Sequence, residues 1–224
     1  MSTKPLNIFI GYDKAETVAY HVCAHSIMMN SSVPVSITPL IYDQLPINRE
    51  KDPLQSTDFT YTRFLVPYLM GYEGVGLFMD CDMLVDCDIA ELFALNDPTK
   101  AVSVVKHDYI PKTKVKFLNN VQSLYPRKNW SSLMLYNAGH DDCKKLTTEV
   151  VSRETGKYLH RFEWTEAIGE LDVMYNHLVG EYNNDTEAKI YHYTLGTPCF
   201  REVRCCDHSH EWHKAQAEMN SHAN

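Results

Sequence analysis

The stretch that decides the fold is VGLFMDCD, which runs from Val75 to Asp82. Its first five residues are apolar or glycine, which predicts a short buried strand. Asp80 and Asp82 follow directly, and side chains two residues apart in an extended chain point the same way. Two carboxylates on one side of a strand end form an oxygen site that suits Mg²⁺ or Mn²⁺. A cation there would also remove the repulsion by which each aspartate raises the pKa of the other.

The alternative interpretation of this Asp-x-Asp pattern is an exposed acidic pair in a turn. The surrounding residues favour the metal site, because apolar packing resumes at Val85 and Ile89. Asp86 and Asp88 lie between these two apolar residues. They are better explained as turn and cap residues before a short helix.

Strands and helices alternate on either side of this stretch. Apolar runs predict strands at 7–10, 35–41, 75–79, 101–106 and 130–136. Helical spacing predicts helices at 15–29, 57–70, 89–95, 143–153 and 164–182, with Pro67 kinking or dividing the second. This order is typical of an α/β protein with an open, mainly parallel sheet and flanking helices. Ligands of such sheets gather beyond the carboxyl ends of the strands. Two candidate functional loops are expected there: Gly11-Tyr12-Asp13 after the first strand and Asp80-Cys81-Asp82 after the third.

The composition is that of an ordinary globular protein: 224 residues, 44% of them apolar and 22% charged. This length predicts one domain at 1–201, followed by a polar, His-rich C-terminal tail at 202–224. No apolar run approaches the roughly 18 residues of a membrane helix, and we expect no signal peptide. Seven cysteines in no regular spacing are expected to be reduced thiols. We therefore expect a cytoplasmic protein without an integral membrane segment.

The net charge restricts the class of ligand. Lys and Arg number 21 and Asp and Glu number 29, so the formal charge is 21 − 29 = −8. No basic run is present, which argues against a nucleic-acid partner. An acidic protein that binds a diphosphate needs a local source of positive charge, and a divalent cation on the aspartate pair is such a source.

Four segments together resemble glycosyltransferase family 8, the glycogenin-like and galactosyltransferase-like enzymes. Residues 76–85 resemble its metal-binding strand, and residues 60–69 resemble its arginine-bearing helix. Residues 130–139 are similar to its strand ending in Asn-Ser-Gly, and residues 192–198 to its late His-x-x-Gly-x-x-Pro region. The segments follow the family's order and cover the chain from about Ile8 to Phe200.

The resemblance implies a GT-A type, Rossmann-like fold and a nucleotide-diphosphate-sugar donor, most often a UDP-sugar. It implies transfer of the sugar with retention of configuration, by double displacement or by front-face attack. It also implies that Asp80, Asp82 and His192 bind Mn²⁺ or Mg²⁺. Variable loops are expected to bind the acceptor, here 108–128 and the region after Trp164. Their sequences are compatible with a glycan, a lipid-linked sugar, a protein or a small molecule as acceptor.

The resemblance also assigns donor-binding and catalytic residues. Asn137 is expected to line the sugar pocket, and Asp172 is the candidate nucleophile if the reaction has one. The residues expected at the donor are Gly11, Tyr12, Asp13, Arg63, Asp80, Cys81 and Gly196.

The chain departs from the family pattern in two places. The late region normally ends in a diphosphate-binding Lys and a Trp, whereas 197–200 is Thr-Pro-Cys-Phe, and Arg201 or Arg204 is the available substitute. The family's Asp-Gln-Asp segment is matched by Glu170-Leu171-Asp172, followed by Asn176, with the spacing off by about one residue. These departures bear on the donor and the chemistry more than on the fold.

The same residues are compatible with two other functions. A GT-A domain that binds nucleotide-sugar or glycan without turning it over is one alternative, and a haloacid-dehalogenase-like phosphohydrolase, whose Asp-x-Asp also follows a strand, is another. Two further groups contain metal-ligand types. One is the pair His21 and His25, better explained as solvated helix residues, and the other is the C-terminal cluster Cys205, Cys206, His208, His210 and His213.

Overall fold

The computed structural model describes residues 4–50, 55, 57–110, 112, 126–183 and 187–221. Their larger sheet has six strands in the order β2-β1-β3-β6-β5-β7. The strands are β1 (Leu6–Gly11), β2 (Val35–Leu40), β3 (Val75–Met79), β5 (Val102–Val105), β6 (Leu133–Asn137) and β7 (Ile168–Leu171). β1 is parallel to β2 and β3, and β5 is parallel to β7, while β6 is antiparallel to both of its neighbours. The prediction of an open, mainly parallel α/β sheet is confirmed.

A second sheet of three short strands has the order β4-β9-β8. Its strands are β4 (Met83–Val85), β8 (His177–Leu178) and β9 (Ile190–His192). β4 is antiparallel to β9, with Met83 opposite His192. This register brings a residue near the C-terminus of the chain beside the Asp80–Asp82 segment, which comes directly before β4.

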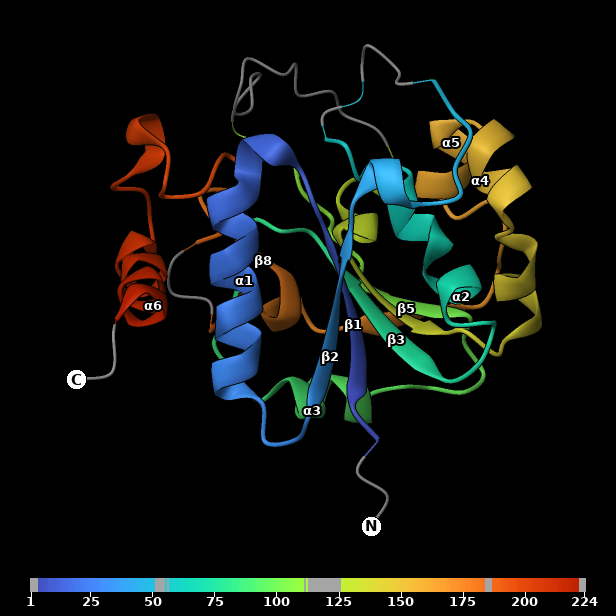
Figure 1. Ribbon diagram of the computed structural model, residues 1–224, viewed down its shortest axis with the longest axis horizontal. Helices are drawn as coiled ribbons and strands as arrows, with labels where there is room; N and C mark the ends of the chain where they lie inside the picture. The colour runs from blue at the N-terminus through green and yellow to red at the C-terminus, as the bar shows by residue number, and fades with distance from the viewer. Residues whose placement is uncertain are drawn as a thin grey trace.

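Helices flank the larger sheet on two sides (Figure 1). α1 and α6 lie to the left in that view, and α2, α4 and α5 lie to the right. The helices are α1 (Thr17–Asn30), α2 (Val66–Leu69), α3 (Ile89–Ala94), α4 (Thr148–Arg153), α5 (Gly156–His160) and α6 (Ser209–Asn220). Four 3₁₀ turns matter for the site: η1 (Lys14–Glu16), η3 (Thr62–Leu65), η5 (Trp130–Ser132) and η7 (Val173–Asn176).

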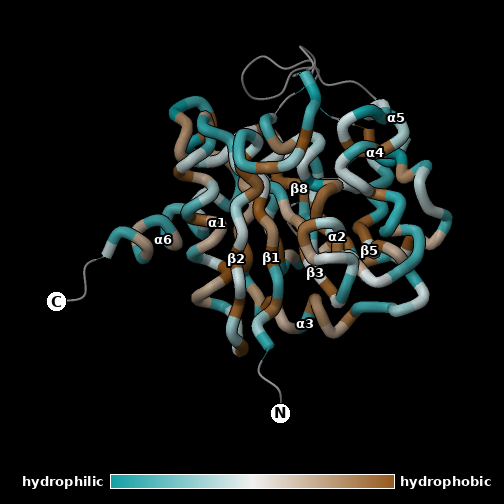
Figure 2. Tube along the Cα trace, turned by 45° about the vertical axis from the view of Figure 1, so that its right-hand side comes forward, coloured by the Kyte–Doolittle hydropathy of each residue, from teal (hydrophilic) through white to brown (hydrophobic). Residues whose placement is uncertain are grey.

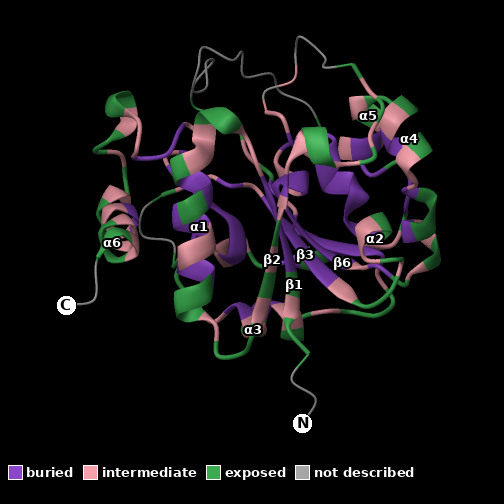
Figure 3. Ribbon diagram, viewed as in Figure 1, coloured by how far each residue is buried: buried purple, intermediate pink, exposed green. Residues whose placement is uncertain are grey.

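The core lies between these layers. The central strands are the most apolar part of the trace (Figure 2) and the most deeply buried (Figure 3). All four residues of β5 and the last four of β3 are buried. Strands that are buried on both faces are continuous apolar runs rather than alternating ones, which explains why they are easily recognised in the sequence.

The predicted helix at 164–182 is wrong. The segment contains β7, η7 and β8 instead. Its buried and exposed residues alternate over Ile168–Leu171, and it pairs with β5. Gly169 lies so close to β5 that an added Cβ would be 2.3 Å from the Ser103 hydroxyl. The tertiary pairing therefore overrides a local pattern that was compatible with a helix.

Two other predicted helices are present but divided. The segment 57–70 contains η3 and α2, with Pro67 in the first turn of α2, where its missing N–H costs nothing. The segment 143–153 begins inside a 3₁₀ turn at Asp141–Lys145 and ends with α4. The helices predicted at 15–29 and 89–95 are α1 and α3.

The C-terminal region predicted as a polar tail contains α6. Trp212 on α6 has only 1% of its surface exposed and belongs to a second hydrophobic cluster. The other buried members of this cluster are Val22, Leu84, Val179, Tyr191 and Tyr193. The helix thus packs against the body of the chain through α1 and the smaller sheet, while the boundary at residue 202 stays a prediction.

Candidate functional site

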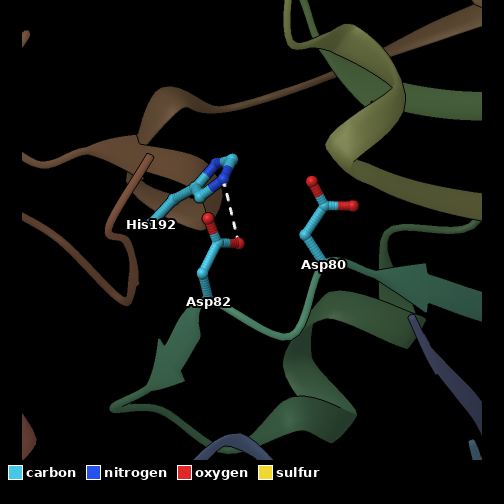
Figure 4. Close-up of side chains that lie close together, drawn as sticks. All are labelled: Asp80, Asp82 and His192. Atoms are coloured by element: carbon cyan, nitrogen blue, oxygen red, sulfur yellow. Dashed lines mark ion pairs between the residues drawn. The ribbon is translucent and has the colours of Figure 1, made fainter. Parts of the chain in front are cut away.

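Asp80, Asp82 and His192 converge at the carboxyl end of β3 (Figure 4). One ligand atom from each residue lies within 4.8 Å of the other two. His192 Nε2 is 3.2 Å from Asp82 Oδ1. Two carboxylate oxygens and an imidazole nitrogen suit Mn²⁺, and Mg²⁺ through the oxygens. Within the described ranges of the chain, these three residues are the only such group of three or more His, Cys, Asp and Glu side chains.

The buried strand positions both aspartates. Cys81, between them, is fully buried and points into the core. Cys81 and Asp82 form the turn after β3, and the carboxylates on either side of Cys81 are only partly buried and meet at the cluster. The backbone N–H of Asp80 donates to Ser132 O at 2.9 Å, and Tyr193 N–H donates to Asp82 O at 2.9 Å. Each aspartate is therefore fixed by a segment that is distant in sequence.

Arg63 lies against Asp80 rather than in open solvent. Its side chain is 7% exposed, and Nη1 is 2.9 Å from Asp80 Oδ1. Nη1 also donates to Ser131 O at 2.8 Å, and Nε donates to Phe59 O at 3.3 Å. The guanidinium thus balances one carboxylate of the cluster and ties η3 to η5. Its contact with the donor stays a prediction.

Glu16 adds a further carboxylate that the sequence reasoning missed. Its Oε2 accepts a hydrogen bond from the Cys81 thiol at 3.8 Å. Burial, assisted by the charges of Asp82, Asp13 and Asp80 and opposed by the hydrogen bond from Cys81, raises the pKa of Glu16 to about 8. Four acidic side chains around one point mark a place that favours a cation. The spacing Asp13-x-x-Glu16 directly after the first strand was the available signal.

Gly11, Tyr12 and Asp13 lie at the carboxyl end of β1, next to the end of β3. A Cβ on Gly11 would be 2.4 Å from the Phe59 ring, so close packing requires glycine there. The Asp13 carboxylate accepts from the N–H groups of Ala15 and Asp58 at 2.8 and 2.9 Å, which joins two loops at the site. The expected contacts of these residues with a nucleoside stay predictions.

The structure does not bring Asn137 to the Asp80, Asp82 and His192 cluster, and its expected place in the sugar pocket stays a prediction. β6 is antiparallel to β3, so Asn137 lies opposite Val75, at the start of β3, whereas Asp80 follows its end. The Asn137 side chain donates to Pro98 O at 3.0 Å. The other end of β6 approaches the site, and Ser131 and Ser132 are the residues of this segment that contact Arg63 and Asp80.

Asp172 and Gly196 lie in different surroundings. Asp172 is exposed at the carboxyl end of β7, where Oδ1 accepts from Met174 N–H at 2.9 Å, and its catalytic role stays a prediction. Glu170 forms an ion pair with Lys106 at 3.4 Å.

Gly196 has φ +120°, a backbone conformation that favours glycine. It lines a cavity of about 230 Å³ together with Gly180, Tyr193 and Cys206 among others.

The segment that replaces the family's Lys and Trp passes near the acidic cluster. Burial raises the pKa of the Cys199 thiol, the hydrogen bond with Thr197 opposes this, and the Glu16 carboxylate adds to it. Arg201 and Arg204 follow on the surface. Neither forms an ion pair with the residues that the structure describes, so both are sterically available to an anionic ligand.

The two other candidate metal groups do not assemble in the described part of the chain. Cys205 is exposed, and His213 Nε2 donates to Arg204 O at 3.0 Å. His21 and His25 also find no third ligand there. The segment 108–128, expected to contact an acceptor, lies largely outside the described residues. None of the described helices is both long and apolar enough to cross a membrane.

Comparison with curated proteins shows a clear relative. Protein CDI of Arabidopsis thaliana is 44% identical over 228 residues, which cover 97% of this chain and 88% of the relative. The chain belongs to the Protein CDI family. No model of a known protein family matches it, and the assignment to family 8 stays a prediction.

Solved structures establish the fold of this CDI-family chain. The bifunctional glycosyltransferase WbbM superposes with a TM-score of 0.65 at 14% identity over 97% of this chain, and this chain spans 50% of WbbM. The glycosyltransferase GlyE of Streptococcus pneumoniae TIGR4 superposes with a TM-score of 0.62 at 12% identity, over 94% of this chain and 60% of GlyE. The galactosyltransferase LgtC, in complex with donor and acceptor sugar analogs, superposes with a TM-score of 0.59 at 12% identity, over 98% of each chain. The CDI-family chain has the GT-A glycosyltransferase fold.

Proposed function

We propose that this chain is a metal-dependent hexosyltransferase that takes the sugar of a UDP-sugar and transfers it, with retention of configuration, to an acceptor. The observation that carries the proposal is the convergence of Asp80, Asp82 and His192 at the carboxyl edge of a GT-A sheet. This is the edge where ligands of open α/β sheets bind.

The charges around the cluster support a metal-bound diphosphate. Asp13, Glu16, Asp80 and Asp82 all lie near one point, and Arg63 is bonded to Asp80. A bare diphosphate would be repelled by this arrangement. A Mn²⁺ or Mg²⁺ ion held by Asp80, Asp82 and His192 would supply Lewis-acid stabilisation of the leaving nucleotide.

The protein's own residues then orient the donor. The turn Gly11-Tyr12-Asp13 borders the cluster at the end of β1, which supports its proposed contact with the nucleoside. Arg201 and Arg204 are the available cations for the outer phosphate oxygens, where the family pattern has lysine. Asp172 is exposed at the same edge of the sheet, which supports its proposed role beside the sugar.

The test is donor hydrolysis by the purified protein across a panel of UDP- and GDP-sugars with Mn²⁺. Release of nucleotide from one donor, abolished by EDTA and by Asp82→Ala, is the expected result. Asp86→Ala is the matched control, because Asp86 is an exposed aspartate four residues away at the other end of β4. Mn²⁺-dependent nucleotide binding without turnover would favour a binding domain, and absence of both would overturn the proposal.

A further inference from the structure

A chain of three hydrogen bonds, two buried and the last part-buried, runs from His192 to the backbone carbonyl of Asn129, the residue just before η5. His192 Nδ1 lies 2.9 Å from Asn176 Oδ1, and Asn176 Nδ2 donates to Ser132 Oγ at 2.9 Å. Ser132 Oγ donates to the carbonyl oxygen of Asn129 at 2.7 Å. Asn176 has 0%, His192 3% and Ser132 3% of its surface exposed. Burial on this scale keeps water from replacing these bonds.

The direction of every bond in this chain is fixed by its last member. A backbone carbonyl only accepts, so the single Ser132 hydroxyl proton is used on Asn129 O. Ser132 Oγ must then accept from Asn176, which therefore presents its NH₂ group to Ser132 and its oxygen to His192. An oxygen at this position requires the proton of neutral His192 on Nδ1.

We propose that Asn176 and Ser132 are positioning residues that hold His192 in the Nδ1–H tautomer, with the Nε2 lone pair directed at the metal position. This inference rests on the metal site of the proposed function. Asn176 acts through His192 and has no contact with the reacting atoms.

The distances at the other end of the imidazole agree with this assignment. Nε2 lies 3.2 Å from Asp82 Oδ1. Ligands of an octahedral ion at 2.0–2.1 Å are about 3 Å apart, so the two atoms have the spacing of neighbouring ligands. This spacing allows one cation to be bound by both atoms, and the Nδ1–H tautomer leaves the Nε2 lone pair available to that cation.

The turn η5 also fixes Asp80, the proposed metal ligand on the other side of the cluster from His192. Ser132 O accepts from the backbone N–H of Asp80 at 2.9 Å, and Ser131 O accepts from Arg63, which contacts Asp80. η5 therefore connects Asp80 and His192, two ligands that are 112 positions apart in the sequence. Outer partners of metal ligands typically change metal affinity by about 10–100-fold when they are mutated.

The first measurement needs no variant. In ¹⁵N-histidine-labelled, metal-free protein at pH about 8.5, well above the ordinary pKa of histidine, the side-chain nitrogen shifts report the tautomer of His192. The expected result is a protonated Nδ1 and an unprotonated Nε2. An Nε2–H tautomer in the wild-type protein would overturn the inference.

The second measurement is Mn²⁺ affinity, by calorimetry and by the paramagnetic resonance signal of free Mn²⁺. Asn176→Leu should weaken binding by about 10–100-fold. Asn176→Asp should keep or raise the affinity, because a carboxylate also accepts from Nδ1–H. Circular dichroism and thermal melting of both variants establish that they fold. Equal affinities of wild type and folded Asn176→Leu would contradict the proposal.

Ser132→Ala separates orientation from packing. In the wild-type background it frees the Asn176 amide to turn, so both Mn²⁺ affinity and the Nδ1–H population should fall. In the Asn176→Asp background it should have no effect on either, since both carboxylate oxygens accept. An equal loss in the two backgrounds would show a purely structural role. If Mn²⁺ binding follows this pattern but no sugar is transferred, the proposed function is refuted, while the positioning of His192 by Asn176 and Ser132 still stands.

Discussion

His192 lies opposite Met83 in the pairing of β9 with β4, and this places its Nε2 3.2 Å from Oδ1 of Asp82, the residue just before Met83. The adjoining bond from Tyr193 N–H to Asp82 O, at 2.9 Å, continues the same ladder. Two backbone strands therefore hold the two side chains at ligand spacing. The consequences for metal binding, stability and pH dependence can be measured separately.

His192→Ala should lower Mn²⁺ affinity by at least about 100-fold, more than the loss of an outer partner. The reason is that it removes one of the three proposed protein ligands and leaves two aspartates. Donor turnover should fall with it. Calorimetry with Mn²⁺ measures the first effect, and nucleotide release measures the second.

His210→Ala is the matched control for His192→Ala, because His210 is an exposed histidine of α6. It should leave Mn²⁺ affinity at the wild-type value. Equal losses in the two histidine variants would mean that the metal binds elsewhere.

Arg63→Met should destabilise the fold by about 3–5 kcal/mol, as the removal of one partner from a buried ion pair does. It leaves the largely buried Asp80 carboxylate without its guanidinium. The free energy of unfolding from urea titration measures the loss. The double variant Arg63→Met with Asp80→Asn should lose less than Arg63→Met alone. A larger loss in the double variant would contradict the pairing.

Glu16 should make the metal-free protein less stable as the pH rises from about 4.5 to about 8. Burial, assisted by the charges of Asp82, Asp13 and Asp80, raises its pKa from 4.5 to about 8 in the folded state. The folded state therefore binds more protons than the unfolded state in that window, and unfolding becomes easier with each pH unit, by at most about 1.4 kcal/mol. Urea titrations across this window measure the slope.

Glu16→Gln should flatten this slope and raise the stability above pH 8, because it removes the buried charge. Glu154→Gln, at a half-buried glutamate directly after α4, is the control and should reproduce the wild-type slope. An unchanged slope in Glu16→Gln would show that another group titrates.

Trp212→Ala should cost about 3–5 kcal/mol of stability, the usual loss for a buried tryptophan. Trp212 fixes α6 to the cluster of Val22, Leu84 and Tyr193, so the body of the chain feels its removal. Thermal unfolding followed by circular dichroism measures the effect. A melting temperature equal to that of wild type would restore the interpretation of 202–224 as a tail without a structural role.

The central strand and the aspartate pair at its end could be predicted from local sequence patterns. The apolar run at Val75–Met79 and the aspartates at 80 and 82 are local patterns, and the structure has both where they were expected. His192 was reached only through the family resemblance, since a single histidine carries no local signal of a ligand. The mainly parallel α/β fold followed from the alternation of elements, which is also local.

Strand direction, strand register and the docking of α6 could not be predicted from the sequence, because they depend on contacts between distant segments. β6 is antiparallel to β3, so Ser132 rather than Asn137 reaches the site. Periodicity gives the same pattern for both directions of a strand, and pairing between distant segments chooses one. The β4–β9 register, the contact of Asn176 with His192 and the burial of Trp212 have the same origin. Each depends on free energy gained between segments that are far apart in the chain, which no short stretch of sequence contains.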